Sequence, residues 1–227
     1  MLTIRKAADR GTTNIGWLDS KHTFSFGDYT DARHHNFRTL RVLNDDRVAA
    51  GQGFGTHPHR DMEIFTWVLS GELAHQDSLG TGATIRAGEW QAMSAGTGAA
   101  HSEFNPSPTV PAHFLQMWVT PARRGLTPSY QQQAFAPPPG TWQTTLSPDG
   151  RDGSLIIHQD AVIRTATLTA TPLMHDLAPG RGAWLHVATG TATVNGVELH
   201  EGDAIAAEGE ATLTLTGDGQ VVLFDLV

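Results

Sequence analysis

Two pairs of residues in this sequence have the types and the spacing of metal ligands. His57 and His59 lie two positions apart in the segment THPHRDME, and His101 and Glu103 have the same spacing in AAHSEFN. Residues two apart on a β-strand point to the same face. Two such pairs on neighbouring strands would bring together three imidazoles and one carboxylate, a set that suits a first-row divalent metal. A six-coordinate ion held this way would keep two positions open for substrate or dioxygen.

A second carboxylate competes for the same role. Glu63 shares the strand parity of His57 and His59, so it is the alternative ligand to Glu103. Either glutamate could also act as a general base. A single His-x-His pair is common and is weak evidence for a metal site. The repeated two-residue spacing is what favours the metal interpretation.

The elements that must position these residues are short strands. The chain of 227 residues contains 24 Gly and 12 Pro, which favour strands joined by tight turns. Residues 64–69, IFTWVL, are β-branched and aromatic, and residues 112–120, AHFLQMWVT, alternate in the same way. Asn195-Gly196 is a strong two-residue hairpin signal. We therefore expect an all-β protein.

The chain divides into two similar halves. The phrases LSGELAHQDSLGTGATIRAGEW and ATGTATVNGVELHEGDAI share an order of strand, Gly, strand, turn and strand, which indicates an internal duplication of a small barrel. A stretch rich in Pro, Gln and Gly at residues 121–140 has the character of a linker. We expect a metal-binding domain over residues 1–130 and a second domain over residues 131–227.

The second half lacks the metal pattern. It contains no His-x-His pair, and His175, His186 and His200 are scattered along it. We expect its metal site to be degenerate and the domain to be structural, covering the first barrel or closing a dimer. In the first half, His22, Phe24 and Phe26 are expected to be either core residues or the lining of a pocket mouth. His75 and Asp77 are expected to hold a turn.

Composition excludes several classes of function. The formal net charge of −8 with scattered Lys and Arg argues against nucleic acid as a direct partner. The sequence has no Cys, which excludes disulfide scaffolds and thiol catalysis. No run of about 18 apolar residues is present to span a membrane. We expect a cytoplasmic protein.

These motifs resemble a known family. The pattern G-x5-H-x-H-x3-E from Gly51 to Glu63 resembles the first cupin motif, and H-x3-N at His101 and Asn105 resembles the end of the second. Over residues 15–135 the longer strings GFGTHPHRDMEIFTWVLSGELAHQDSLG and SAGTGAAHSEFNP resemble the pirin branch of that superfamily. The resemblance implies a bicupin, two tandem jelly-roll-like cupin barrels, with Glu103 rather than Glu63 as the fourth ligand.

The same resemblance implies an activity. Bacterial members that this chain resembles are quercetin 2,3-dioxygenases, which use one metal per chain to cleave flavonols such as quercetin with dioxygen and release carbon monoxide. Fe²⁺ is the first choice, and Cu²⁺, Ni²⁺, Co²⁺, Mn²⁺ and Zn²⁺ suit the same ligands. The alternative is a regulatory iron protein that acts through protein partners and redox sensing. Both interpretations allow a monomer or a homodimer.

Overall fold

Strands make up nearly all of the regular structure. The computed structural model describes residues 1–227, and its helices are the single turns η1 (Ala7–Asp9) and η2 (Arg151–Gly153). The all-β prediction is confirmed. Neither helix has the length and apolar character needed to span a membrane.

The chain forms two compact units. The N-terminal barrel consists of Gly11–Phe135 together with Ile157–Gln159, and the C-terminal barrel consists of Met1–Arg10, Ala136–Ile156 and Asp160–Val227. Each unit contains a seven-stranded sheet and a four-stranded sheet. This arrangement confirms the expected pair of jelly-roll-like barrels.

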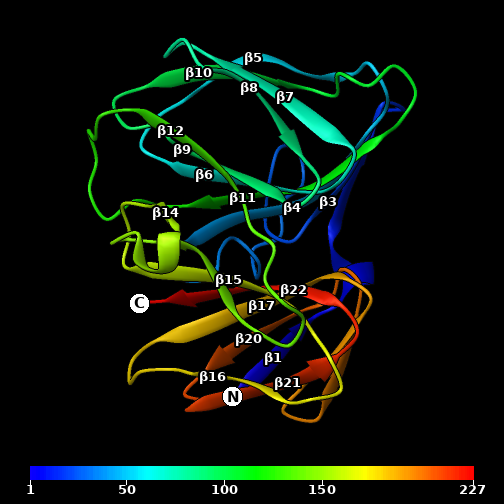
Figure 1. Ribbon diagram of the computed structural model, residues 1–227, viewed down its shortest axis with the longest axis vertical. Helices are drawn as coiled ribbons and strands as arrows, with labels where there is room; N and C mark the ends of the chain where they lie inside the picture. Colours follow the sequence, from blue (N-terminus) through cyan, green and yellow to red (C-terminus); the bar gives the residue numbers. More distant parts are fainter. The chain divides into compact units, whose positions relative to one another are not determined.

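The N-terminal barrel packs two sheets against each other (Figure 1). The seven-stranded sheet runs in the order β12 (Ser129–Ala134), β9 (Glu89–Ser94), β6 (Glu63–Ser70), β11 (Ala112–Val119), β4 (Leu40–Val48), β3 (Leu18–His22) and β2 (Gly11–Asn14). The four-stranded sheet runs β5 (Gly53–His59), β10 (Ala99–Phe104), β7 (Glu72–Asp77) and β8 (Gly82–Arg86).

Alternation along β6 decides what lies inside this barrel. Val68 packs into the core between the sheets, and Thr66 points inward to a polar cluster. Trp67 faces the other way and stacks on Trp90, with ring centroids 5.4 Å apart. One end of the interior is therefore apolar, while polar side chains occupy the other.

The C-terminal barrel repeats the plan. Its seven-stranded sheet runs β1 (Leu2–Arg5), β20 (Ala204–Glu208), β17 (Gly182–Thr189), β22 (Gln220–Leu226), β15 (Ala161–Thr167), β13 (Gln143–Ser147) and β14 (Leu155–Ile156). Its four-stranded sheet runs β16 (Leu173–Asp176), β21 (Thr212–Gly217), β18 (Thr191–Val194) and β19 (Val197–His200). Gly71 and Gly190 occupy equivalent corners with φ of 73° and 70°, which accords with a duplication.

The interior of the C-terminal barrel is aliphatic. Leu185, Val187, Leu213 and Leu223 belong to one fully buried cluster that fills the space between its sheets. His175 is buried against Asp225, with 3.1 Å between Nε2 and Oδ2. That imidazole is therefore part of a local polar network.

The domain boundary differs from the expected one. The predicted division between residues 130 and 131 falls inside β12, which pairs with β9 as an edge strand of the N-terminal barrel. Residues 157–159 also return to that barrel, where the Gln159 amide donates to the Thr120 carbonyl at 2.8 Å. The Gln-rich run resembles a linker in composition, but its backbone completes a sheet.

The first ten residues belong to the C-terminal barrel. β1 pairs with β20, and Asp203 fastens the segment that follows. The Asp203 carboxylate accepts hydrogen bonds from Lys6 Nζ at 2.8 Å and from the Ala7 amide at 2.7 Å. Burial raises the pKa of Asp203, but these hydrogen bonds outweigh it and hold the pKa below its usual value. Asp203 therefore stabilises the fold at neutral pH, and this contribution is lost as acid protonates the carboxylate.

Asp203→Ala should lower the free energy of unfolding of the C-terminal barrel by about 1.5–3 kcal/mol, the usual contribution of hydrogen bonds to a charged group. Lys6→Met is the matched control. It removes only a cation whose side chain is 46% exposed, so we expect a loss below about 1 kcal/mol. Urea denaturation monitored by circular dichroism measures both. Equal losses for the two variants would mean that the ion pair, rather than the buried backbone contact, fastens the segment.

Candidate metal centre

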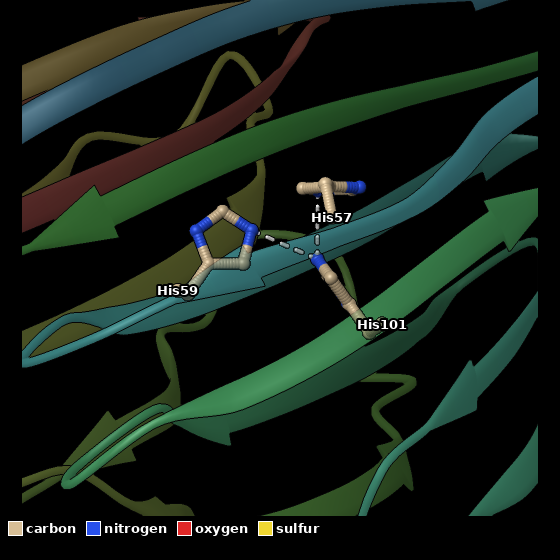
Figure 2. Close-up of side chains that lie close together, drawn as sticks. All are labelled: His57, His59 and His101. Carbon is tan, nitrogen blue, oxygen red and sulfur yellow. Dashed lines mark hydrogen bonds between the residues drawn. The ribbon is translucent and has the colours of Figure 1, made fainter.

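Three imidazoles meet at one point of the N-terminal barrel. His101 Nε2 lies 3.0 Å from His59 Nε2 and 3.1 Å from His57 Nε2. Figure 2 shows the rings of His57 and His59 turned toward His101 from the neighbouring strand. The structure thus brings together three of the four predicted ligands, and the three form a group suited to hold a metal ion.

Strand pairing produces this convergence. β10 pairs antiparallel with β5, so that His101 lies opposite His57 and Ala99 lies opposite His59. The register then shifts between His101 and Glu103, which marks a β-bulge. Bulges bend a strand and redirect its side chains, and they are frequent beside functional sites. The two-residue spacing predicts the shared face, whereas the bulge is visible only in the structure.

The imidazoles present lone pairs rather than protons. His57 Nδ1 lies 2.8 Å from the Gly55 carbonyl, which can only accept, so Nδ1 carries the hydrogen and Nε2 is free to act as a ligand. Burial, together with repulsion from the neighbouring imidazoles, lowers the pKa of His59 to about 4 and that of His101 to about 3. Neutral imidazole is the form that a metal requires.

A buried relay orients His101 from behind. Its Nδ1 lies 3.4 Å from His75 Nδ1, and His75 Nε2 lies 2.9 Å from Asp77 Oδ2. The side chains of His75 and Asp77 are both 0% exposed. Burial raises the pKa of Asp77, but the hydrogen bonds from His75 and from the Thr81 and Leu79 amides outweigh it, so the pKa is lowered. An ionised Asp77 would hold a hydrogen on His75 Nε2 and leave His75 Nδ1 to accept from His101.

This relay is a function that sequence reasoning missed. His75 and Asp77 were expected only to hold a turn, and Asp77 does accept the turn amides of Leu79 and Thr81. The contact between His75 and the site arises from strand register, because β7 pairs with β10 and places His75 opposite Glu103. The available signal is that His75 and Asp77 form a His-x-acid pair with the same spacing as His101 and Glu103.

Glu103 lies behind the histidines in a polar cluster. It is 1% exposed, and its carboxylate accepts hydrogen bonds from Gln91 Nε2 at 2.6 Å and Gln116 Nε2 at 2.7 Å. Burial raises its pKa, opposed by the nearby histidines and these hydrogen bonds. Its ligand atoms group with His101 and His75, whereas His57 and His59 form the other group with His101. His101 is the member that the two groups share.

Glu63, the predicted alternative to Glu103, belongs to neither group of metal-type ligands. The turn before β6 includes Asp61 at φ 50°, so strand parity does not carry over from His59. Glu63 falls on the face of β6 opposite Thr66. Its Oε2 accepts from the Ser94 hydroxyl at 2.8 Å and from the His158 amide at 3.2 Å. Glu63 therefore holds the returning segment 157–159.

A cavity of about 260 Å³ reaches the candidate metal centre, and both His57 and Glu103 contribute to its wall. Aromatic rings line one part of it, including Phe26, Phe54 and Trp118. The Trp118 ring also stands against His59, with centroids 5.0 Å apart at an interplanar angle of 83°. Flat apolar walls beside a cluster of metal-type ligands suit a planar aromatic molecule.

Polar side chains line another part of the cavity. Ser20, His22, Asn44, Asp46 and Gln116 belong to this wall. His22 Nδ1 lies 2.9 Å from Asn44 Oδ1, and His22 Nε2 lies 2.9 Å from Thr13 Oγ1. Of the two roles expected for His22, Phe24 and Phe26, His22 and Phe26 line the pocket, whereas Phe24 is a buried core residue.

Comparison with known families covers both barrels. A family model described as Pirin matches residues 3–119, and a model described as the quercetinase C-terminal cupin domain matches residues 144–226. A protein of Escherichia coli strain K12 named quercetin 2,3-dioxygenase is 49% identical over 229 residues, which are 100% of this chain and 99% of that protein.

Solved structures give the same picture. The crystal structure of YhhW from Escherichia coli has a TM-score of 0.97 with 47% identity, and covers 100% of this chain and 98% of its own. A structure of bacterial pirin YhhW in complex with nickel(II) has a TM-score of 0.96 with 48% identity, covering 100% of this chain and 99% of its own.

His75→Leu should weaken metal binding by roughly 10- to 100-fold while leaving the barrel folded, the usual effect of removing a residue that orients a metal ligand. His113→Leu is the matched control, because His113 forms another, partly buried imidazole–carboxylate contact: its Nε2 lies 2.8 Å from Asp45 Oδ1. Competition with a chelator gives the affinity, and circular dichroism reports folding. An unchanged affinity in the His75 variant would contradict the orienting role.

Proposed function

The chain belongs to the pirin family of the cupin superfamily, and we propose that it is a metal-dependent dioxygenase that cleaves flavonols such as quercetin. The observation that carries the proposal is the cluster of three imidazoles at a cavity with aromatic walls. His101 Nε2 lies 3.0 Å from His59 Nε2 and 3.1 Å from His57 Nε2. The name of the 49% identical Escherichia coli protein supports the same substrate class.

We propose that His57, His59, His101 and Glu103 hold one divalent metal per chain. The hydrogen bond at His57 Nδ1 and the neutral state of His59 and His101 suit such an ion. Fe²⁺ is our first candidate; Cu²⁺, Ni²⁺, Co²⁺, Mn²⁺ and Zn²⁺ match the same donor set, and nickel(II) binds the related pirin. When bound, the ion supplies a Lewis acid for the substrate hydroxyl and redox chemistry for dioxygen.

The protein's own part is to bind, orient and shield the substrate. Phe26, Phe54 and Trp118 would contact the faces of the fused rings and exclude water from the reacting carbons. The polar wall would bind ring hydroxyls. In the overall reaction, one flavonol and one dioxygen give a ring-opened ester and one carbon monoxide.

Purified wild-type protein should contain one metal per chain after reconstitution, and it should consume quercetin and dioxygen in equal amounts while releasing carbon monoxide. His101→Ala should lose the metal and the turnover without unfolding, because the two-sheet core does not depend on the ion. Elemental analysis, oxygen uptake and circular dichroism measure these outcomes.

His35→Ala is the control for the loss of an imidazole, because His35 is an exposed residue of the same barrel. A wild-type protein with full metal content and no flavonol turnover would refute the dioxygenase proposal. It would favour the regulatory alternative, in which the centre serves redox sensing and a protein partner.

Glu103→Gln and Glu63→Gln form a second matched pair. In the first variant a new amide N–H must face the amide donors of Gln91 or Gln116, so the cluster rearranges and a ligand is lost. We expect metal affinity to fall by at least the roughly 10- to 100-fold that loss of an orienting partner costs. Glu63→Gln should keep wild-type affinity, and a chelator titration showing the reverse order would mean that Glu63 is the fourth ligand.

A further inference from the structure

Flavonol cleavage needs a group that accepts the proton of the substrate hydroxyl, and Glu103 is poorly placed for that task. Each carboxylate oxygen of Glu103 already accepts a short amide hydrogen bond, from Gln91 at 2.6 Å and from Gln116 at 2.7 Å. Thr66 Oγ1 lies a further 3.3 Å from the same oxygen as Gln91. An oxygen accepts at about two lone-pair sites. Once one site is given to a metal, little capacity is left for a proton.

The ring nitrogens of the histidines that line the cavity already have partners. His57 contributes Nε2 to the metal centre and Nδ1 to the Gly55 carbonyl. His22 uses Nδ1 for Asn44 and Nε2 for Thr13. Asp28 also lines the cavity, but it is exposed and in contact with solvent. The remaining ionisable side chain of the cavity wall is Asp46.

One carboxyl oxygen of Asp46 makes no hydrogen bond. The residue is 4% exposed and lines the cavity, and its Oδ1 atom has no hydrogen-bond partner. Its carboxyl group hydrogen-bonds to Ser20, which holds the side chain in place. A buried carboxyl oxygen without a partner costs free energy, so a native structure that keeps one has a reason to do so.

Sheet register places Asp46 near the metal centre. Asn44 on β4 lies opposite Gln116 on β11, and Asp46 lies opposite Phe114. Asp46 is therefore diagonal to Gln116, at a Cα separation of about 7–8 Å. The Gln116 amide donates directly to Glu103, and Asp46, Gln116, Glu103 and His57 line the same cavity.

The charges around Asp46 suit a base that works near neutral pH. Burial raises its pKa to about 7; the Ser20 hydrogen bond opposes this, and the charges of Asp45, Glu103 and Asp19 add to it. The histidines that share the cavity are His22 and His57. A general base works best when its pKa lies near the operating pH.

We propose that Asp46 is the general base that takes the proton from the flavonol hydroxyl. The substrate O–H bond breaks, a new O–H bond forms on the Asp46 carboxylate, and the electron pair stays on the substrate oxygen. Glu103 then serves only as a ligand. This inference rests on the proposed flavonol cleavage, and it assigns Asp46 a catalytic contact with the substrate.

Asp46→Asn tests the proposal, because it keeps the size of the side chain and a group that can bond to Ser20 but cannot accept a proton. At matched metal content, kcat for quercetin should fall by roughly 10²-fold or more, the usual scale for a lost general base, with a smaller change in KM. Binding without oxygen gives a second readout: the absorption shift of the flavonol anion, complete in wild type, should be reduced at neutral pH.

Asp45→Asn is the matched control. Asp45 is a buried aspartate of the same strand on the opposite face, where its carboxylate contacts Arg47 and His113. Because the Asp45 charge only adds to a pKa of Asp46 that burial already raises, we expect kcat and the anaerobic absorption shift to change far less than in Asp46→Asn. Asp46→Ala provides a further variant, in which added formate or acetate should partly restore turnover by replacing the missing carboxylate.

The outcomes separate this inference from the proposed function. If wild type cleaves quercetin and Asp46→Asn keeps its kcat and its anion spectrum, Asp46 is not the base, although the dioxygenase assignment stands. If Asp46→Asn does not fold, absence of carboxylate rescue in a folded Asp46→Ala likewise excludes Asp46 as the base. If wild type has no flavonol turnover, the proposed function itself fails.

Discussion

The candidate metal centre depends on keeping three imidazole lone pairs directed at one point. The Nε2 atoms of His57 and His59 both lie within hydrogen-bond distance of His101 Nε2. Adding protons to this cluster would place like charges in contact. Burial and mutual repulsion keep His59 and His101 neutral. Nδ1 of His57 is held by the Gly55 carbonyl, and Nδ1 of His101 by the His75–Asp77 relay. The paired strands β5 and β10 of the surrounding barrel hold the three imidazoles in this arrangement.

The two barrels show what the metal centre requires of a core. Both pack a seven-stranded sheet against a four-stranded sheet. The C-terminal barrel fills that space with aliphatic side chains such as Leu185 and Leu223. In the N-terminal barrel, a hydrogen-bonded polar cluster around Glu103 occupies part of the interior. Each oxygen of Glu103 accepts an amide hydrogen bond, which offsets part of the cost of burying the carboxylate.

Local periodicity in the sequence predicted one part of the structure. Two-residue spacing placed His57, His59 and His101 on converging faces, and alternation in IFTWVL predicted the strand β6. Other features depend on long-range pairing that the sequence does not display. The expectation that Glu63 shares a strand face with His57 and His59 failed, because the turn at Asp61 separates their strands. The relay through His75 follows from the pairing of β7 with β10, and β12 has the polar composition of a linker although it pairs as a strand. Asp46 gave no motif, since its importance comes from what surrounds it.

A single ion held by His57, His59, His101 and Glu103 is the centre of the proposed chemistry, although the free structure also groups His75 with His101 and Glu103. An anomalous-scattering crystal structure of the metal-loaded protein tests this ligand set directly. We expect one peak per chain, at about 2.1 Å from the Nε2 atoms of His57, His59 and His101 and bonded to a Glu103 oxygen. A peak bound to His75, or a second full peak elsewhere in the chain, would contradict it.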